Sequence, residues 1–407
     1  MSKSPLAPAE TPRLPGISGF RVWVAETGMK YKGRCDLLVV HCEEETSVAG
    51  VLTQSSTSSA PVQWCRENLN NGRARALVVN AGNANAFTGS AGRTSVSEVC
   101  TRLGEAINCL PQEIMTASTG VIGEQLDTAA ITRHFAGMTE HFGDDWNAAA
   151  EAIMTTDTFA KVSNRTCQIG DCTVTLNGIA KGSGMIEPNM ATMLAFVFTD
   201  AEIPPGVLKT LLVEANEGAF NAVTVDSDTS TSDTCLIFAS GRASHMAITD
   251  GDSEHLIDFK ERLADLMQDL AIQIVRDGEG ATKLVRIDVQ GAGTDDDARL
   301  VGKSIANSPL VKTAIAGEDA NWGRIVMAVG KSGALVDQNR LNISIGGVAI
   351  TANGAPLPDY DEIPVASHLK GSEIDVAVDL GMGTGHALTW TCDLTHGYIE
   401  INADYRS

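Results

Sequence analysis

The chain has 407 residues, of which 43% are hydrophobic and 20% are charged, as in globular proteins that bury a large core. Its formal net charge of -21 repels phosphate backbones and anionic membrane surfaces, so we expect neither nucleic acid nor a membrane as a partner. The sequence has no apolar run of about 18 residues, and its Pro-rich N-terminus lacks the apolar stretch of a signal peptide, so we expect neither a membrane span nor a secretion signal.

Nine cysteines are scattered along the chain, and no two of them form a C-x-x-C pair. An odd number at irregular spacing fits free thiols in a reducing compartment, so we predict a cytoplasmic protein. The eight histidines are also isolated. Because none of this spacing is typical of zinc ligands, we expect no metal site.

Strands and helices are interleaved along the chain without strict βαβ alternation. The pattern predicts strands over 20–26, 35–41, 75–80, 167–169, 173–179, 193–200, 235–240, 283–291, 341–345, 374–379, 386–391 and 398–402. It predicts helices over 95–109, 125–142, 146–154, 206–220, 253–276 and 309–316. This arrangement favours an α+β fold with layered αββα architecture over a doubly wound sheet.

The segment 181–200 combines a Gly-rich loop with a buried strand; it reads KGSGMIEPNMATMLAFVFTD. Glycines before Thr192 allow the backbone conformations that an internal N→O acyl shift needs. Cleavage there would give Thr192 a free α-amine with a pKa of about 7.7–8.0, which suits a general base beside a nucleophilic hydroxyl. The alternative is an ordinary Gly-rich loop that enters a core strand.

Three further motifs have a chemical and a structural interpretation. The segment 117–124, ASTGVIGE, can present a hydroxyl and a backbone N–H as an oxyanion hole, or it can be a helix entry capped by Ser118 or Thr119. GMGTG at 381–385 precedes a strand pattern, so we expect a hairpin loop and no dinucleotide site. TVDSDTSTSDT at 224–234 lacks the Gly and Glu of a calcium loop, which favours a structural turn near the site.

Seven strings in family order, over nearly the whole chain, resemble the ornithine acetyltransferase family, also called glutamate N-acetyltransferase. They are NAGNANAFTG (80–89), STGVIGE (118–124), MTTDTFAK (154–161), KGSGMIEPNMATML (181–194), TVDSDTSTSDT (224–234), NWGRI (321–325) and INADYRS (401–407). The departures are small: Ser407 stands where the family often has Thr, and 227–232 reads SDTSTS where it often has G-D-T-S-T-N.

The resemblance implies a precursor that cuts itself between Ala191 and Thr192, giving an alpha chain 1–191 and a beta chain 192–407 with a β-rich portion at about 285–407. We expect these chains to assemble as a heterotetramer of two alpha and two beta chains. The implied fold has two β layers between helical layers, similar to N-terminal nucleophile hydrolases but differently connected.

By position, Thr192 matches the family's nucleophile, and Thr119 and Gly120 match its oxyanion hole. The positions that match substrate contacts are Lys181, Glu279, Asn402, Ser407 and one residue of the pair Thr155 and Thr156. The implied reaction moves an acetyl group from N-acetylornithine to glutamate in cyclic arginine biosynthesis, without a cofactor. Whether acetyl-CoA is a further donor stays open. Two alternative functions also stay open: a related self-cleaving amidase or aminopeptidase that uses water as the acceptor, and a protein that only binds an amino acid.

Overall fold

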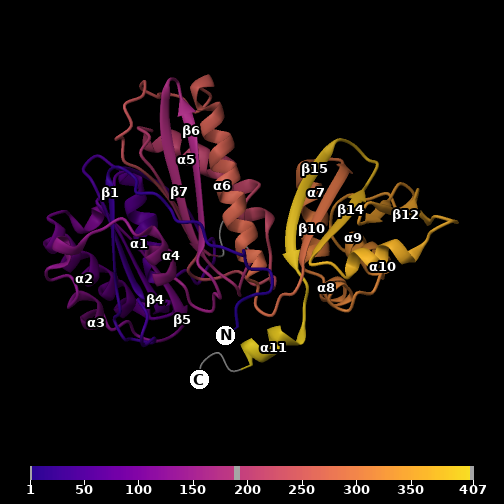
Figure 1. Cartoon of the computed structure of the whole chain (residues 1–407), viewed down its shortest axis with the longest axis horizontal. Helices are drawn as coiled ribbons and strands as arrows, with labels where there is room; N and C mark the ends of the chain where they lie inside the picture. The colour runs from indigo at the N-terminus through magenta and orange to yellow at the C-terminus, as the bar shows by residue number, and fades with distance from the viewer. Residues whose placement is uncertain (1, 188–192, 404–407) are drawn as a thin grey trace.

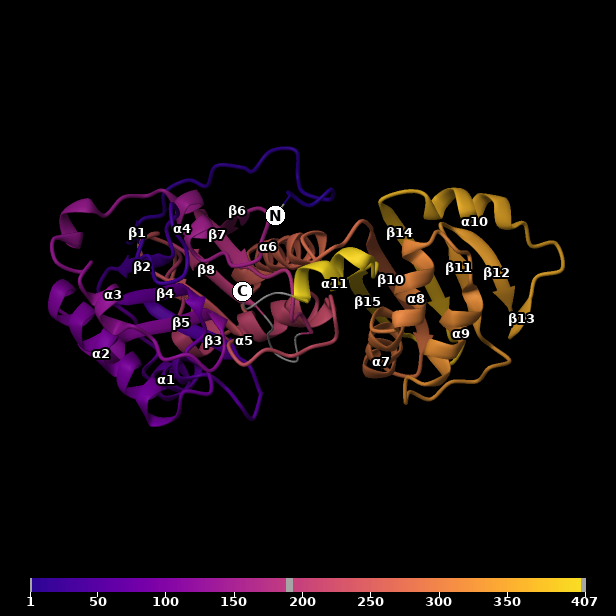
Figure 2. The same ribbon diagram turned by 90° about the horizontal axis from the view of Figure 1, so that it is seen from below.

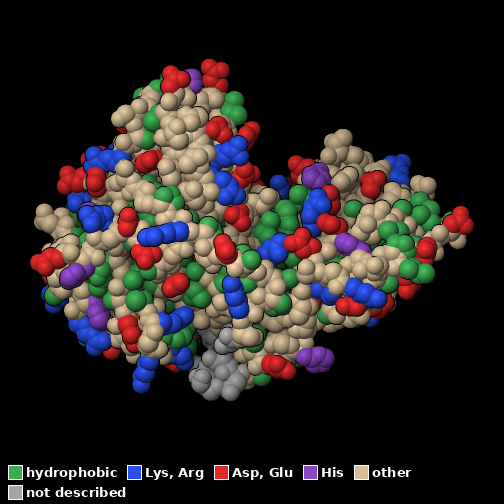
Figure 3. Space-filling model, viewed as in Figure 1, with side chains coloured by type: hydrophobic (Ala, Val, Ile, Leu, Met, Phe, Trp, Pro, Cys, Tyr) green, Lys and Arg blue, Asp and Glu red, His purple; other side chains and the backbone are tan. Residues whose placement is uncertain are grey.

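The computed structural model describes residues 2–187 and 193–403 and has two bodies of different layering (Figure 1). The larger body precedes residue 284, and the smaller one follows it. A notch between them is visible on the surface (Figure 3). Acidic and basic side chains are spread over this face of the molecule rather than gathered in one patch. Among the helices that the structure describes, none is both long and apolar enough to cross a membrane.

Two sheets lie face to face in the larger body. The four-stranded sheet has the order β1 (Phe20–Ala25), β2 (Leu37–Cys42), β4 (Ala76–Asn83), β5 (Ile114–Val121). The five-stranded sheet has the order β3 (Ser47–Leu52), β9 (Thr234–Ala239), β8 (Leu194–Thr199), β7 (Cys172–Lys181), β6 (Lys161–Ile169). Every residue of β8 is buried, because one face of this strand packs against the other sheet and the opposite face packs against helices.

Alternation along β8 divides its side chains between two cores. Phe196 and Phe198 pack with Leu38 and Leu77 of the opposing sheet. Val197 belongs to the core on the other side. A strand covered on both faces needs apolar residues at every position, which is why its sequence is a continuous apolar run.

Helices cover both outer faces of the sheet pair, so the predicted αββα layering is confirmed. The helices over the four-stranded sheet are α1 (Ala60–Asn68), α2 (Gly89–Ile107) and α3 (Thr128–Thr132). Those over the five-stranded sheet are α5 (Pro205–Glu217) and α6 (Ile257–Arg276), and α4 (Trp146–Ala152) packs into the core between the sheets. Leu263, Leu266 and Leu270 of α6 face the sheet, as the apolar stripe of that helix predicts.

The smaller body has a core of its own around a six-stranded sheet. The strand order is β13 (Ala355–Pro356), β12 (Val348–Ala352), β11 (Asn342–Ile345), β14 (Glu373–Asp379), β10 (Leu284–Ala292), β15 (Gly385–Cys392). Its helices are α7 (Asp295–Ala306), α8 (Pro309–Ala316), α9 (Trp322–Gly330) and α10 (Glu362–Leu369). After β15 the chain turns back toward the larger body as α11 (His396–Asn402), which lies between the two bodies in both ribbon views (Figure 2).

Three local expectations are wrong. The predicted strand 398–402 is part of helix α11, because Thr395 caps the helix by accepting a hydrogen bond from the Gly397 amide. The predicted helix 125–142 is split into α3 and a short 3-10 helix, separated by Gly137 at a φ of 74°. A strand does follow 381–385, but this loop is no hairpin, because β10 lies between the two strands that it connects.

Candidate active site

A cavity of about 490 Å³ opens where the two sheets of the larger body meet the return of the chain from the smaller body. Seven of the residues assigned to the site from the sequence line it: Thr119, Gly120, Thr155, Thr156, Lys181, Glu279 and Asn402. They come from five separate segments of the chain. The other three assigned residues, Ala191, Thr192 and Ser407, lie outside the described residues.

The first described residues after Thr192 belong to this cavity. Met193 and Leu194 line it, and Leu194 pairs with Lys181 in the antiparallel ladder of β7 and β8. The Met193 carbonyl accepts a hydrogen bond of 2.9 Å from the Thr234 amide at the start of β9. The start of β8 is therefore fixed beside Lys181.

Thr119 and Gly120 reach the cavity from β5, so the alternative of a helix cap does not hold for this segment. Gly120 has a φ of 131°, and a Cβ there would lie 2.2 Å from the carbonyl carbon of Gly82 on the neighbouring strand. Only glycine fits at this position. Ser118 points to the other side of the strand, where its hydroxyl donates to Asn80 Oδ1 at 2.6 Å.

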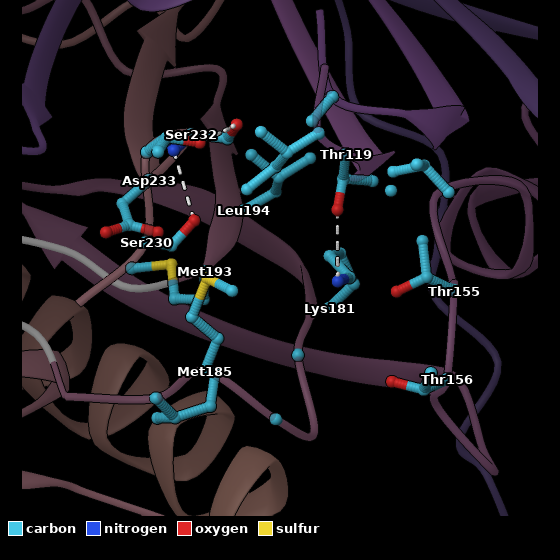
Figure 4. A pocket seen from close by; sticks show the side chains of 18 of the residues that line it. Thr119, Thr155, Thr156, Lys181, Met185, Met193, Leu194, Ser230, Ser232 and Asp233 are labelled. Atoms are coloured by element: carbon cyan, nitrogen blue, oxygen red, sulfur yellow. Dashed lines mark hydrogen bonds between the residues drawn. The ribbon is translucent and has the colours of Figure 1, made fainter. Parts of the chain in front are cut away.

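Lys181 is a buried cation at the end of β7. Its Nζ donates to Thr119 Oγ1 at 3.2 Å and lies 4.0 Å from Asp157 Oδ2. Burial lowers the pKa of Lys181, and the nearby Asp157 carboxylate opposes that shift. Figure 4 shows the ammonium of Lys181 directed at Thr119. The arrangement can hold a carboxylate or a developing oxyanion.

Behind Lys181 lies a fully buried ion cluster that the sequence did not suggest. Lys161 Nζ donates to Asp157 Oδ1 and to Asp277 Oδ2, each at 2.6 Å, and all three side chains are inaccessible to solvent. Burial opposes ionisation of Asp157, but Lys161 and Lys181 together hold the pKa of its carboxyl well below the usual range. Asp157 also accepts hydrogen bonds from the backbone amides of Thr155 and Gly182, and it therefore joins two walls of the cavity.

Both threonines of the Thr155–Thr156 pair lie on the same wall of the cavity (Figure 4). The hydroxyl of Thr156 is 2.6 Å from that of Ser183. A third wall is the turn after α6, where Glu279 accepts a hydrogen bond of 2.7 Å from Asn402. Burial raises the pKa of Glu279, and the hydrogen bond from Asn402 opposes this shift. A carboxylate at the wall of the cavity can receive an ammonium group of a ligand.

Another wall is formed by Ser230, Thr231, Ser232 and Asp233, which were not assigned to the site from the sequence. The Asp233 side chain is buried, and its Oδ2 has no hydrogen-bond partner among the described residues. Burial raises the pKa of Asp233 well above the ordinary value. This wall belongs to the turn 224–234, which is close to the cavity as the sequence predicts. Within the described part of the chain, no group of three or more His, Cys, Asp or Glu side chains is arranged to hold a metal ion.

Hydroxyl, lysine and carboxylate side chains gathered around one cavity of an αββα body suit an enzyme active site. The sequence matches the ArgJ family over residues 21–407. The chain is 52% identical to the arginine biosynthesis bifunctional protein ArgJ of Agrobacterium fabrum over 408 residues, which cover 99% of each chain. The ArgJ protein of Bradyrhizobium diazoefficiens is also 52% identical, over 100% of this chain and 99% of that one.

A crystal structure of ArgJ from Bacillus halodurans is 42% identical over 50% of this chain and 95% of that chain, with a TM-score of 0.49. Family membership rests on the two sequence relatives and on the family match. The chain belongs to the ArgJ family and is an enzyme of arginine biosynthesis. The family resemblance inferred from the seven strings is thereby confirmed.

Proposed function

We propose that the protein transfers the acetyl group of N-acetylornithine to glutamate through an acetyl ester on Thr192. One observation carries the proposal. Seven residues assigned to the site from the sequence, on five separate segments, line the cavity in which β8 begins. Thr192 is joined by one peptide bond to Met193, which lines that cavity.

The nucleophile is generated by self-cleavage between Ala191 and Thr192. The Thr192 hydroxyl attacks the preceding carbonyl, the resulting ester is hydrolysed, and chains 1–191 and 192–407 remain associated. The α-amine released at Thr192 serves as the general base. Two copies of each chain form a heterotetramer.

Transfer then follows a ping-pong course. The Thr192 hydroxyl attacks the acetyl carbonyl of N-acetylornithine, and Thr119 and the Gly120 amide stabilise the oxyanion. The C–N bond breaks, and ornithine leaves with the proton that the Thr192 amine removed. The amine of glutamate then attacks the acetyl ester, the C–O bond to Thr192 breaks, and the proton lost by the glutamate amine returns to the Thr192 hydroxyl. Lys181 binds the α-carboxylate that donor and acceptor share, while Glu279 receives an ammonium group. One amide replaces another, so the exchange needs neither a nucleotide nor a metal.

The test combines intact mass with acetyl transfer. Purified protein should consist of chains 1–191 and 192–407 and should form N-acetylglutamate from N-acetylornithine and glutamate. Thr192→Ala should give one uncut chain without transfer. Acetate release that does not depend on glutamate would identify an amidase instead. Replacing N-acetylornithine by acetyl-CoA in the same assay decides whether acetyl-CoA is a second donor.

A further inference from the structure

The last described residue before the cleavage segment, Glu187, is held by the smaller body. Asn307, which ends α7, donates a hydrogen bond of 2.7 Å from Nδ2 to Glu187 Oε1. The amide oxygen of Asn307 accepts a hydrogen bond of 2.8 Å from the Thr224 hydroxyl. Both ends of the Asn307 side-chain amide are thus engaged, which fixes the orientation of its donor toward Glu187.

The same helix also carries a half-buried cation. Lys303 lies one turn before Asn307 and donates to the Val223 carbonyl at 2.7 Å. Its charge interacts favourably with the Glu187 carboxylate. Helix α7 therefore presents a donor and a positive charge to one side chain of the larger body.

The backbone of Glu187 is held as well. Its amide donates to the Asp228 carbonyl at 3.0 Å, and its carbonyl accepts a hydrogen bond of 3.2 Å from the Thr229 hydroxyl. On the far side of the cleavage segment, Met193 is fixed by the Thr234 amide. Both described ends of this stretch are therefore anchored.

We propose that Asn307 is a positioning residue for self-cleavage, because it holds the side chain of Glu187, the last described residue before the cleavage point. The inference rests on the proposed cleavage between Ala191 and Thr192. An acyl shift needs a hydroxyl and a carbonyl carbon in near-attack geometry, and its rate falls when the approach to that geometry is loosened. The smaller body thus takes part in maturation through α7, although it does not supply the nucleophile.

The experiment follows cleavage of the full chain with time after cell-free synthesis, by the appearance of chains 1–191 and 192–407. Asn307→Ala and Glu187→Ala should each slow cleavage by about 10–100-fold, the range that loss of a hydrogen bond to a charged group produces. The double variant should be no slower than Glu187→Ala alone, because that change already removes the contact with Asn307. Glu187→Gln keeps an acceptor for Asn307 and removes the charge beside Lys303, so it should slow cleavage less than Glu187→Ala.

Ser304→Ala is the matched control. Its hydroxyl donates from α7 to the Ala328 carbonyl within the smaller body, so its loss should leave the cleavage rate unchanged. Thermal unfolding of each mature protein separates slow cleavage from poor folding. A wild-type chain that stays whole overturns the proposed cleavage itself. If the wild type cleaves and Asn307→Ala cleaves equally fast, only the role of α7 is overturned. Additive effects in the double variant would overturn that role as well.

Discussion

Asn402 donates a hydrogen bond of 2.7 Å from Nδ2 to Oε2 of Glu279, and this contact joins the last helix of the chain to the turn that follows α6. The other end of α11 contacts the same turn, because the Thr395 hydroxyl donates to the Gly280 carbonyl at 2.6 Å. A Cβ on Gly280 would lie 2.3 Å from the Tyr398 amide nitrogen, so only glycine permits this approach. Helix α11 thereby brings residues near the end of the sequence to the cavity.

Replacing Asn402 by Ala should raise KM for both N-acetylornithine and glutamate by about 10-fold, because the carboxylate of Glu279 loses a hydrogen bond that orients it. Turnover at saturation should change less, since the contact lies away from the acetyl carbonyl in the proposed mechanism. Steady-state kinetics with each substrate varied in turn measure both constants. Glu400→Ala, an exposed position of the same helix, is the control and should match the wild type. An unchanged KM in Asn402→Ala would contradict the role of this contact.

Thr119→Ala should reduce kcat by about 10²–10³-fold, the usual cost of removing one oxyanion donor. Affinity for N-acetylornithine should change much less, because an oxyanion contact is strongest in the transition state. The neighbouring Ser118→Ala is a close control, since Ser118 faces Asn80 and not the cavity. Equal kcat values for the two variants would remove Thr119 from the oxyanion hole.

Local pattern was sufficient for the layering of the larger body. The apolar run 193–200 predicts a strand covered on both faces, and β8 is buried throughout. The apolar stripe of 95–109 likewise predicts α2. Both patterns follow from burial, because the spacing of apolar residues in the sequence reflects which faces of an element are buried.

Local pattern failed where a few polar contacts decide between helix and strand. The alternation in 398–402 suggests a strand, yet Ile399 is 65% exposed and the cap at Thr395 starts a helix instead. None of the residues of α11 is buried, so the alternation does not mark a buried face.

The buried part of the site could not be predicted for a different reason. Lys161 and Asp277 are 116 positions apart, and only packing of α6 against β6 brings them together. The nearer pair, Asp157 and Lys161, lies within a string used for the family resemblance, but four-residue spacing alone is far more often a solvated surface pair. Around Asp233 the sequence shows only a turn rich in hydroxyl residues, which does not predict a buried carboxyl group.

Lys161→Met should lower the free energy of unfolding by about 3–5 kcal/mol, because it leaves Asp157 and Asp277 buried without their shared counter-charge. The urea midpoint of the purified protein measures the loss. Lys260→Met is the control: Lys260 pairs with Glu214 near the surface, and surface pairs contribute only about 0–1 kcal/mol. Changing both carboxylates as well, in Lys161→Met with Asp157→Asn and Asp277→Asn, should recover part of the stability. A Lys161→Met variant as stable as Lys260→Met would show that Lys161 does not stabilise Asp157 and Asp277 in the folded protein.

Deprotonation of Lys303 in the folded protein should raise the free energy of unfolding in mildly alkaline solution. Burial lowers the pKa of Lys303 from 10.5 to about 8, and Glu187 opposes part of that shift. Between these two values the unfolded chain binds more protons than the folded protein, so the free energy of unfolding increases with pH across this window. The gain is on the order of 3 kcal/mol when the full window is crossed.

The measurement compares wild type with Lys303→Met in urea at intervals from neutral pH to beyond the upper end of this window. Other titrating groups contribute equally to both proteins, so the difference isolates Lys303. Wild type should gain stability relative to the variant as pH rises through about 8, and the difference should level off once the unfolded lysine has also lost its proton. A difference that stays flat throughout would mean that Lys303 is no more buried in solution than an ordinary surface lysine.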